Sequence, residues 1–342
     1  MSSQSVKRIV SSLSGILPIE KLMLPQRHQF ILPFWHAVSD AQLPHLSKLY
    51  SVPTISAFER TLDFLLLNYK PASVEDVGRL ASSRGKQEKK LFFPSFDDGL
   101  TPCYEVIAPI LKRKGIQAAF FITPMFVGNM TLFHRHKASL LLNSLEEQKL
   151  KTPELKEAKG LLQKRFNNQS LYDFLRHTVY TDHWLLDQMA QLFDIDFDHF
   201  MRKEKPYMTI DQIVELQEDG FLIGAHGMDH REFYLSSEQE IMEQISSSMH
   251  YLMQEVNPPV KTFAFPYTDF NVSDTVFERA NREKLWDLSF GTAGIKDETM
   301  LNHLQRMPME SSKGVDGKRV IRTEYLWYYM KSVFGKNKVR RQ

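Results

Sequence analysis

The sequence predicts an α/β protein whose parallel sheet is either open or closed into a β/α barrel. Short apolar runs that are typical of buried strands alternate along the chain with segments of helical periodicity, and Leu91 to Ile122 form one complete strand, helix and strand unit. Strands joined by such a crossover run parallel and are buried on both faces, which explains their continuous apolar character. The repetition of this unit indicates a barrel or an open parallel sheet.

In the first half of the chain, apolar runs predict strands and apolar residues three or four apart predict helices. Thr101 and Pro102 favour a helix start, because a hydroxyl can cap free amides and proline suits the first helical position, and Gly115 supplies the stop. The expected strands are Phe30 to Trp35, Leu91 to Phe96 and Ala118 to Ile122, and the expected helices are Ser56 to Leu67 and Thr101 to Leu111.

The second half continues the pattern. Thr209 is expected to cap a helix that runs to Glu218, and Ser237 with Glu240 has the spacing of a capping box that opens a second helix. Two prolines, Pro258 and Pro259, end that helix. The remaining expected elements are a helix over Val272 to Glu283 and strands at Phe221 to Ile223, Thr262 to Phe265, Leu288 to Phe290 and Leu304 to Met307.

The region from Asn129 to Lys205 departs from this alternation, since it is long, charged and helix-prone. We therefore expect residues 129–205 to be a helical insertion on a barrel formed by residues 30–128 and 206–330. Residues 1–29 are expected to form an amphipathic segment, and residues 331–342 a basic, solvated tail. His134 and His136 lie in the insertion, where a solvated helix face is the expected position and an accessory site is the alternative.

Composition excludes several classes of protein. The formal charge is only +2, from 43 basic and 41 acidic residues, so the field is too weak to indicate nucleic acid as the main partner. The single cysteine, Cys103, excludes an internal disulfide. No stretch reaches the roughly 18 to 20 apolar residues of a membrane span, and the N-terminus makes a poor secretory signal. We expect a cytoplasmic protein without a transmembrane segment, with peripheral membrane contact as the alternative.

Three polar clusters follow predicted strands, at the edge where parallel α/β folds gather reactive groups. Asp97 and Asp98 form the first, His226 and His230 the second, and Pro266-Tyr267 with the following Thr268-Asp269 the third. Either of the first two alone would have an ordinary explanation, as a polar turn or a helix surface. Adjacent carboxylates repel each other unless a cation neutralises them. Together, Asp98, His226 and His230 offer one oxygen and two nitrogens, a set that suits catalytic Zn²⁺.

Three protein ligands leave a metal position open for water, whose pKa would fall to about 7 on the metal. Asp97, which is not needed as a ligand, is then free to accept a proton as general base.

The order and spacing of these clusters resemble the polysaccharide deacetylases, a family that includes chitin, peptidoglycan and nodulation-factor deacetylases. The resemblance covers residues 30 to 128 and 206 to 309, and the motifs that carry it are Trp35 to Asp40, Ser95 to Gly99, Gly115 to Ile122, Ile223 to His230 and Phe263 to Tyr267.

The resemblance implies a distorted β/α barrel of the deacetylase type, with seven or so strands and therefore fewer than in the full eight-stranded form. It also implies a divalent metal on Asp98, His226 and His230, with Zn²⁺ expected and Co²⁺ or Ni²⁺ as alternatives. Asp97 would be the base, the backbone amide of Tyr267 would help to stabilise the oxyanion, and Pro266 and Tyr267 would border the substrate. An N-acetylated sugar or glycan is the implied partner.

The sequence departs from the family pattern at two points. Ala264 stands where better-known members have an arginine that orients the catalytic base. A late histidine that protonates the leaving amine has its nearest counterpart in His303, for which an exposed loop position is the ordinary explanation. A water or His36 could supply the proton instead. His36 follows a predicted strand, so it could face the site as a substrate contact or as the acid, and a structural hydrogen bond is the alternative.

Three functions follow from these residues. The first is hydrolysis of the N-acetyl group of an acetamido sugar, oligosaccharide or polysaccharide. The second keeps the fold and the metal but acts as an O-acetyl esterase or on another amide, such as a cyclic imide. The third is a catalytically impaired glycan-binding protein, which Ala264 favours and the retained Asp97 disfavours.

Overall fold

A computed structural model describes residues 30–82, 90–147, 152–163, 170–300, 302–310, 316–339 and 341. The predicted amphipathic segment at residues 1–29 lies outside these ranges. Among the helices that they contain, none combines the length and the apolar character that a membrane crossing requires.

The centre of the molecule is a nearly closed barrel of eight parallel strands, as the α/β alternation predicted. The strands follow one another in the order β10-β9-β8-β7-β6-β5-β2-β11. Their bounds are β2 (Pro33–Trp35), β5 (Ser95–Phe96), β6 (Ala119–Ile122), β7 (Leu222–Ala225), β8 (Thr262–Ala264), β9 (Leu288–Gly291), β10 (His303–Gln305) and β11 (Met307–Pro308).

β10 and β11 stand at opposite ends of the strand order, and the barrel closes where the chain passes directly from one to the other. The sequence predicted a single strand over Leu304 to Met307, but Arg306 interrupts it. The residues before the interruption pair with β9, and those after it pair with β2 on the other side of the ring. This split explains why eight strands are found where seven or so were expected. It also places Arg306 at the seam of the barrel.

A smaller parallel sheet of β1 (Phe30–Ile31), β4 (Leu91–Phe92) and β3 (Lys70–Pro71) adjoins the barrel in the order β1-β4-β3. The predicted strands Phe30 to Trp35 and Leu91 to Phe96 are each divided between the two sheets. Pro94 lies at the second division, and a proline cannot donate a hydrogen bond to a neighbouring strand.

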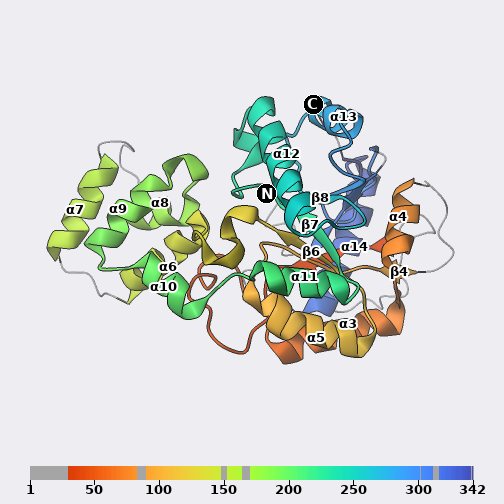
Figure 1. The fold of residues 1–342 in the computed structure, drawn as a ribbon, viewed down its shortest axis with the longest axis horizontal. Coiled ribbons are helices and arrows are strands. Elements are labelled where there is room, and N and C mark those ends of the chain that lie inside the picture. The colour runs from red at the N-terminus through yellow and green to blue at the C-terminus, as the bar shows by residue number, and fades with distance from the viewer. Residues whose placement is uncertain are drawn as a thin grey trace.

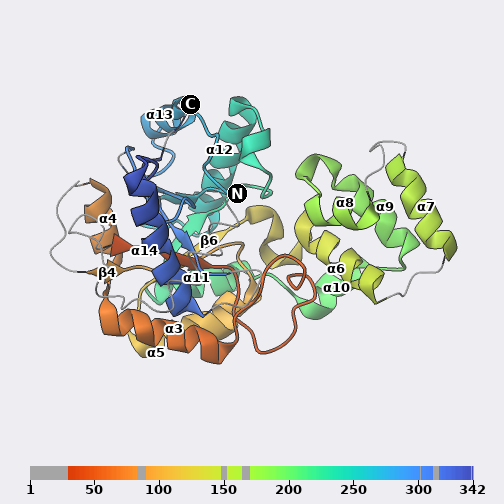
Figure 2. The ribbon, with the colours of Figure 1, turned by 180° about the vertical axis from the view of Figure 1, so that it is seen from behind.

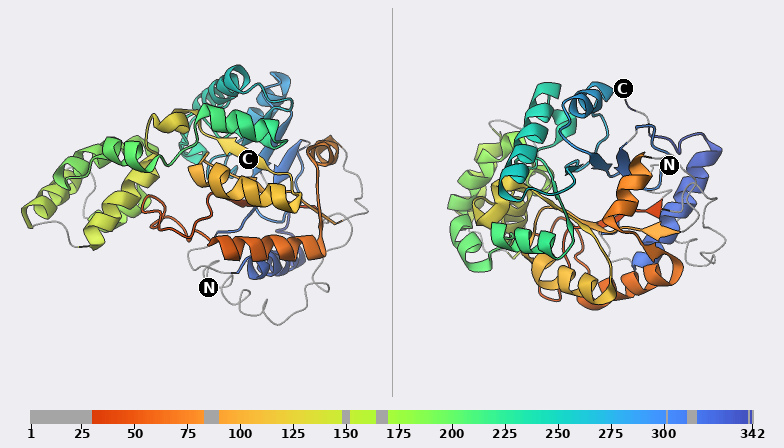
Figure 3. Two further views of the ribbon diagram at one scale, coloured as in Figure 1. Left: turned by 60° about the horizontal axis from the view of Figure 1, so that its bottom comes forward. Right: turned by 45° about the vertical axis from the view of Figure 1, so that its right-hand side comes forward.

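Helices surround the strands, as the right-hand view of Figure 3 shows. The predicted cap at Thr209 and the predicted capping box at Ser237 are confirmed, and the helix at Thr209 also begins with a capping box. A helix begins at Thr101 and Pro102 as predicted, but no side-chain capping bond is found there within the described part of the chain, and the Thr101 hydroxyl donates to the carbonyl of Lys205. The bounds are α3 (Ile55–Asn68), α4 (Val74–Ser82), η2 (Cys103–Ile107), α5 (Ala108–Lys114), η3 (Pro124–Asn129), α11 (Ile210–Glu218), η5 (Phe233–Leu235), α12 (Glu238–Glu255), α13 (Asp274–Arg282) and α14 (Gly317–Val333).

A group of helices lies to one side of the barrel (Figure 1). It consists of α6 (His134–Glu146), α7 (Thr152–Gln163), α8 (Leu171–His177), η4 (Tyr180–Asp182), α9 (Trp184–Leu192) and α10 (Phe197–Glu204). The loop between β2 and α3 reaches across to this group (Figure 2). There the Ser139 hydroxyl donates to the Pro44 carbonyl at 2.8 Å, and Lys48 pairs with Glu146 at 2.5 Å.

The apolar core has two parts because successive side chains of a strand point to opposite faces. Phe120 packs with the outer cluster, where its ring stacks on Phe96 at 5.2 Å. Phe121 belongs to the second cluster, and its ring contacts Phe290 at 5.2 Å. The guanidinium of Arg306 lies 5.0 Å from the Phe121 ring, so the seam arginine is in contact with this second cluster.

Candidate active site

Asp97 and Asp98 follow β5 directly, and both are buried. Asp98 has a φ of 73° and Gly99 a φ of 68°, so the chain turns through two left-handed residues. His230 and Tyr267 also have positive φ, at 58° and 56°. Non-glycine residues with this backbone cost free energy and concentrate at functional sites.

The three predicted metal ligands meet at one point. The carboxylate of Asp98 and the ring nitrogens of His226 and His230 offer ligand atoms that all lie within 4.8 Å of one another. Nε2 of His230 is 3.0 Å from Oδ1 of Asp98, and Nε2 of His226 is 3.7 Å from the same oxygen. All three residues are buried. Asp98 lies more than 120 residues before His226 and His230 in the sequence, yet the three side chains converge as the order of the motifs led us to expect.

Two further observations fit a divalent cation. Although Oδ1 of Asp98 lies 3.0 Å from Nε2 of His230, this buried oxygen makes no hydrogen bond of normal geometry among the described residues, and such an atom is costly unless something compensates it. The other ring nitrogen of His226, Nδ1, lies 2.8 Å from the carbonyl of Ala264. Donation to that carbonyl leaves Nε2 free to bind a metal. Burial lowers the pKa of His226 to about 4, so its ring is neutral near pH 7.

Arg306 supplies the guanidinium beside Asp97 that Ala264 cannot supply. Its guanidinium donates to Asp97 twice, from Nη1 to Oδ1 at 2.6 Å and from Nη2 to Oδ2 at 2.9 Å. Nη1 also donates to the Ser95 hydroxyl at 3.1 Å. Arg306 is fully buried. Burial alone would raise the pKa of the Asp97 carboxyl, but the charges of Arg306 and His226 hold it below its usual value. Asp97 is therefore an ionised carboxylate in a fixed orientation.

His36 follows β2, as predicted, and pairs with Glu310. Nδ1 of His36 lies 2.5 Å from Oε2 of Glu310, and the backbone amide of His36 donates to Oε1 at 2.8 Å. The ring of Tyr50 stacks on the imidazole at 4.7 Å. Burial would lower the pKa of His36, yet the charge of Glu310, with smaller effects from Asp98 and Asp97, raises it to about 9. The side chain keeps 23% of its surface exposed.

Pro266 and Tyr267 follow β8 and lie beside the candidate ligands. The Tyr267 ring packs against the His230 ring at a centroid distance of 4.8 Å. The Thr292 hydroxyl donates to the Tyr267 carbonyl at 3.0 Å. Cγ of Pro266 lies 3.1 Å from where a Cβ would stand on Gly227, which has a φ of 75°, so a side chain there would be crowded and would strain the backbone of the His226 loop.

His303 is buried in β10, and the expectation of an exposed loop residue is wrong. Its Nδ1 lies 2.8 Å from the Ser289 hydroxyl and its Nε2 lies 3.1 Å from Oδ2 of Asp269. Both ring nitrogens therefore have protein partners. This arrangement favours a structural role for His303 and leaves His36 as the better candidate for the general acid.

Asp269, Glu298 and His303 form a second cluster with metal-ligand side chains. Arg341 already neutralises it, because its guanidinium lies 2.8 Å from Asp269 and 2.6 Å from Glu298. The side chain of Arg341 is only 3% exposed, contrary to the expectation that it belongs to a solvated tail. A buried guanidinium takes the place that a cation would need.

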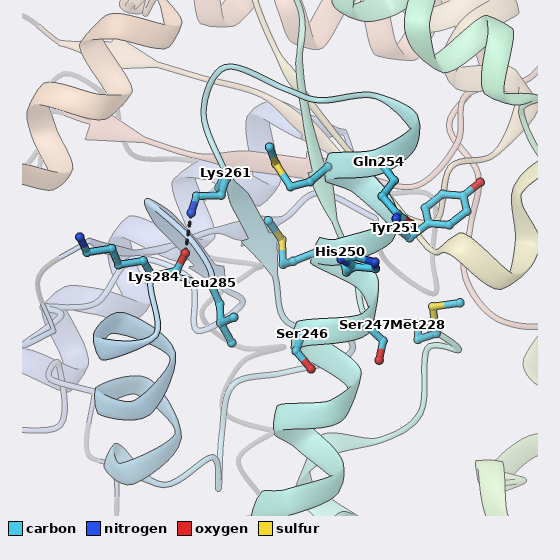
Figure 4. A pocket seen from close by; sticks show the side chains of 11 residues that line it. Met228, Ser246, Ser247, His250, Tyr251, Gln254, Lys261, Lys284 and Leu285 are labelled. Carbon is cyan, nitrogen blue, oxygen red and sulfur yellow. Dashed lines mark hydrogen bonds between the residues drawn. The ribbon is translucent and has the colours of Figure 1, made fainter.

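A cavity of about 720 Å³ lies beside α12 (Figure 4). Met228, His250 and Lys261 are among its lining residues, and Lys261 donates to the Lys284 carbonyl at 2.5 Å. Among the described side chains that line it, neither of the adjacent aspartates nor either candidate histidine ligand is present. The cavity is therefore separate from the candidate centre.

His134 and His136 are buried, so the expectation of a solvated helix face is wrong. His136 hydrogen-bonds through Nδ1 to the Tyr207 hydroxyl at 2.7 Å. Sequence reasoning also missed Arg306 and Glu310. Arg306 lies inside the predicted strand Leu304 to Met307, and a charged residue within a short buried strand was a signal for it, because a buried arginine needs an anionic partner. No comparable signal marked Glu310.

Residues 181–284 match the model of a family described as Polysaccharide deacetylase. Among solved structures, the fold is similar to the Streptococcus pyogenes deacetylase PplD in complex with acetate, with a TM-score of 0.53 and 16% identity over 86% of this chain and 97% of that chain. IcaB from Ammonifex degensii is similar with a TM-score of 0.52 and 14% identity, again over 86% and 97%. No curated protein matches the sequence significantly.

These comparisons confirm the predicted resemblance to the polysaccharide deacetylases and the predicted deacetylase-type barrel. The matched segment contains His226, His230 and Tyr267 but ends before Arg306 and begins after Asp98. At these identities, the two solved structures establish the fold.

Proposed function

We propose that this protein is a metal-dependent hydrolase that removes the N-acetyl group from an acetylated sugar or glycan. The observation that carries the proposal is the buried pair of Arg306 and Asp97 beside the convergent set Asp98, His226 and His230. The family match over residues 181–284 supports deacetylation of a glycan. A glycan-binding protein has no need for an oriented, ionised carboxylate beside a metal site, so catalysis explains the arrangement better.

Asp98, His226 and His230 would hold the ion. One oxygen and two nitrogen donors suit Zn²⁺, with Co²⁺ and Ni²⁺ as alternatives. When bound, such an ion acidifies water and polarises the acetyl carbonyl. The buried Oδ1 of Asp98, which makes no hydrogen bond of normal geometry among the described residues, and the fixed tautomer of His226 support this assignment.

Asp97 acts as general base. It accepts a proton from the attacking water as the water oxygen bonds to the acetyl carbonyl carbon. Arg306 keeps the carboxylate ionised and oriented for that transfer. The backbone amide of Tyr267 donates to the oxyanion of the resulting tetrahedral intermediate.

His36 acts as general acid. The bond between carbon and nitrogen breaks as His36 gives its proton to the leaving nitrogen, so that acetate and a free amine are released. Its Nδ1 is held by Glu310, which leaves Nε2 for the substrate and stabilises the protonated ring. Asp97 gains one proton and His36 loses one, and the two groups exchange these protons with solvent before the next turnover.

Acetate release from a panel of substrates tests the proposal. The panel contains an N-acetylated chito-oligosaccharide, an O-acetylated glycan and a cyclic imide, each incubated with protein loaded with Zn²⁺, Co²⁺ or Ni²⁺. We expect acetate from the N-acetylated substrate and none from the Asp97→Asn variant. Turnover of the ester or the imide alone would establish the second function, and tight glycan binding without any turnover would establish the third.

A further inference from the structure

The backbone of Tyr267 needs support from its surroundings. Its φ of 56° lies in the left-handed region, which is unfavourable for a residue with a side chain. The left-handed backbone orients the amide to which the proposed function assigns the oxyanion. A conformation of this kind persists only when neighbouring groups hold it.

The Tyr267 hydroxyl is held from the other side of the site. It lies 3.3 Å from Nε2 of His134, the first residue of α6. The same nitrogen lies 3.3 Å from Oε1 of Glu232, which follows His230 by two residues. Side chains from the helical group, from the loop that carries the candidate metal ligands and from the β8 loop thus meet at one point.

Glu232 anchors this meeting point. Its side chain is 4% exposed, and its second carboxylate oxygen accepts the backbone amide of Tyr180 at 3.0 Å. The Glu232 carboxylate thereby fixes the His134 ring beside the Tyr267 hydroxyl.

The residue before His134 contacts a candidate metal ligand. The Phe133 ring lies 4.4 Å from the His230 ring, and the Phe133 amide donates to the Tyr207 hydroxyl at 3.0 Å. His230 is therefore packed between Phe133 and Tyr267. The start of α6 therefore contacts both His230 and Tyr267, and each of these two residues has a left-handed backbone.

We propose that His134 and Glu232 are positioning residues that act through the Tyr267 hydroxyl and hold the Tyr267 amide in its left-handed conformation. Segment 129–205, which we propose is an insertion, thereby contributes to the deacetylation machinery. The inference rests on the proposed function, because it concerns the residue assigned there to the oxyanion.

A double-mutant cycle tests this inference. His134→Ala and Tyr267→Phe should each lower kcat about 10-fold or more, with KM nearly unchanged, because misplacement of a transition-state contact affects the chemical step. If His134 acts through the Tyr267 hydroxyl, the double variant should be no slower than the slower single variant. His134→Gln, which can place an amide nitrogen near the position of Nε2, should recover part of the loss.

His183→Ala is the matched control, since His183 lies in the same segment and hydrogen-bonds through Nδ1 to the Tyr180 carbonyl. Its effect on kcat should be small and should add to that of Tyr267→Phe. Hydrogen–deuterium exchange of the peptide from Phe263 to Phe270 gives a readout without turnover. Exchange should be faster in His134→Ala and Tyr267→Phe than in the wild type, and unchanged in His183→Ala.

The outcomes separate the two proposals. A wild-type protein without deacetylase activity would overturn the proposed function, and the exchange measurement would still decide whether His134 holds the Tyr267 loop. An active wild type with unchanged kcat in Tyr267→Phe, or with losses that multiply in the double variant, would overturn the positioning role. If His134→Ala does not fold, Tyr267→Phe and His134→Gln supply the same comparison.

Discussion

Arg306 holds Asp97 in a buried two-pronged ion pair, although 209 residues separate them in the sequence. The family arginine that orients the base would project from the position of Ala264 on β8. Here the guanidinium reaches Asp97, the proposed base, from the seam between β10 and β11 instead. A guanidinium therefore meets Asp97 from a different part of the barrel, so Ala264 by itself does not favour the impaired glycan-binding protein.

Replacement of Arg306 by Gln should impair both activity and stability. Loss of the guanidinium raises the pKa of Asp97, so the acidic limb of the rate profile for kcat/KM should move to higher pH. The uncompensated buried carboxylate should also cost about 3–5 kcal/mol of unfolding free energy. Arg306→Lys keeps the charge but loses the two-pronged hydrogen bonding. Its activity and stability should lie between those of the wild type and those of Arg306→Gln. A pH–rate profile for Arg306→Gln that coincides with that of the wild type would remove Arg306 from the mechanism.

The sequence predicted the barrel and the convergence of Asp98, His226 and His230 because strand ends in a parallel sheet meet at one edge. It did not predict Arg306 as a partner of Asp97, since the interruption of the last strand depends on pairing with both ends of the barrel. His134 and His136 were misplaced for a related reason. Their surroundings are supplied by Tyr207, Glu232 and Tyr267, and no local periodicity reveals contacts of that range.

Replacement of Glu310 by Gln tests the general acid. With Glu310 in place, the pKa of His36 is raised to about 9, so the acid form required for turnover is present below that pH and is lost above it. Removing the carboxylate lowers the pKa of His36, and the alkaline limb of kcat should move to lower pH. His303→Asn should leave that limb in place even if it lowers stability. An alkaline limb that moves in His303→Asn and stays fixed in Glu310→Gln would instead identify His303 as the general acid.

Metal binding should be separable from base catalysis. Addition of Zn²⁺ at about 100 times its Kd should stabilise the folded protein by about 2.7 kcal/mol, because the unfolded chain lacks the assembled ligands. Thermal unfolding with and without Zn²⁺ measures this gain. Asp97→Asn should retain the gain and lose turnover, whereas Asp98→Asn and His226→Ala should lose both. Equal stabilisation of all four proteins would place the ion elsewhere.

His45 should make the folded protein acid-sensitive. Burial lowers the pKa of His45 to about 4, and neither ring nitrogen has a hydrogen-bond partner among the described residues. The unfolded chain binds the proton near the ordinary pKa of 6.5, so the contribution of the neutral ring to stability is complete above that pH.

That contribution falls as the pH drops from 6.5 toward 4, by up to about 3 kcal/mol in total. Urea unfolding at pH 7.5, 6 and 5 should therefore show a smaller loss of stability in His45→Gln than in the wild type. His199 is exposed, and His199→Gln should retain the wild-type loss.

Because His45 packs against His136 at a ring distance of 5.1 Å, acid should loosen the contact between the β2–α3 loop and α6 before it disrupts the barrel. Faster hydrogen exchange in that loop at pH 5 than at pH 7.5, with the barrel strands unchanged, is the expected sign, and simultaneous exchange of both would contradict it.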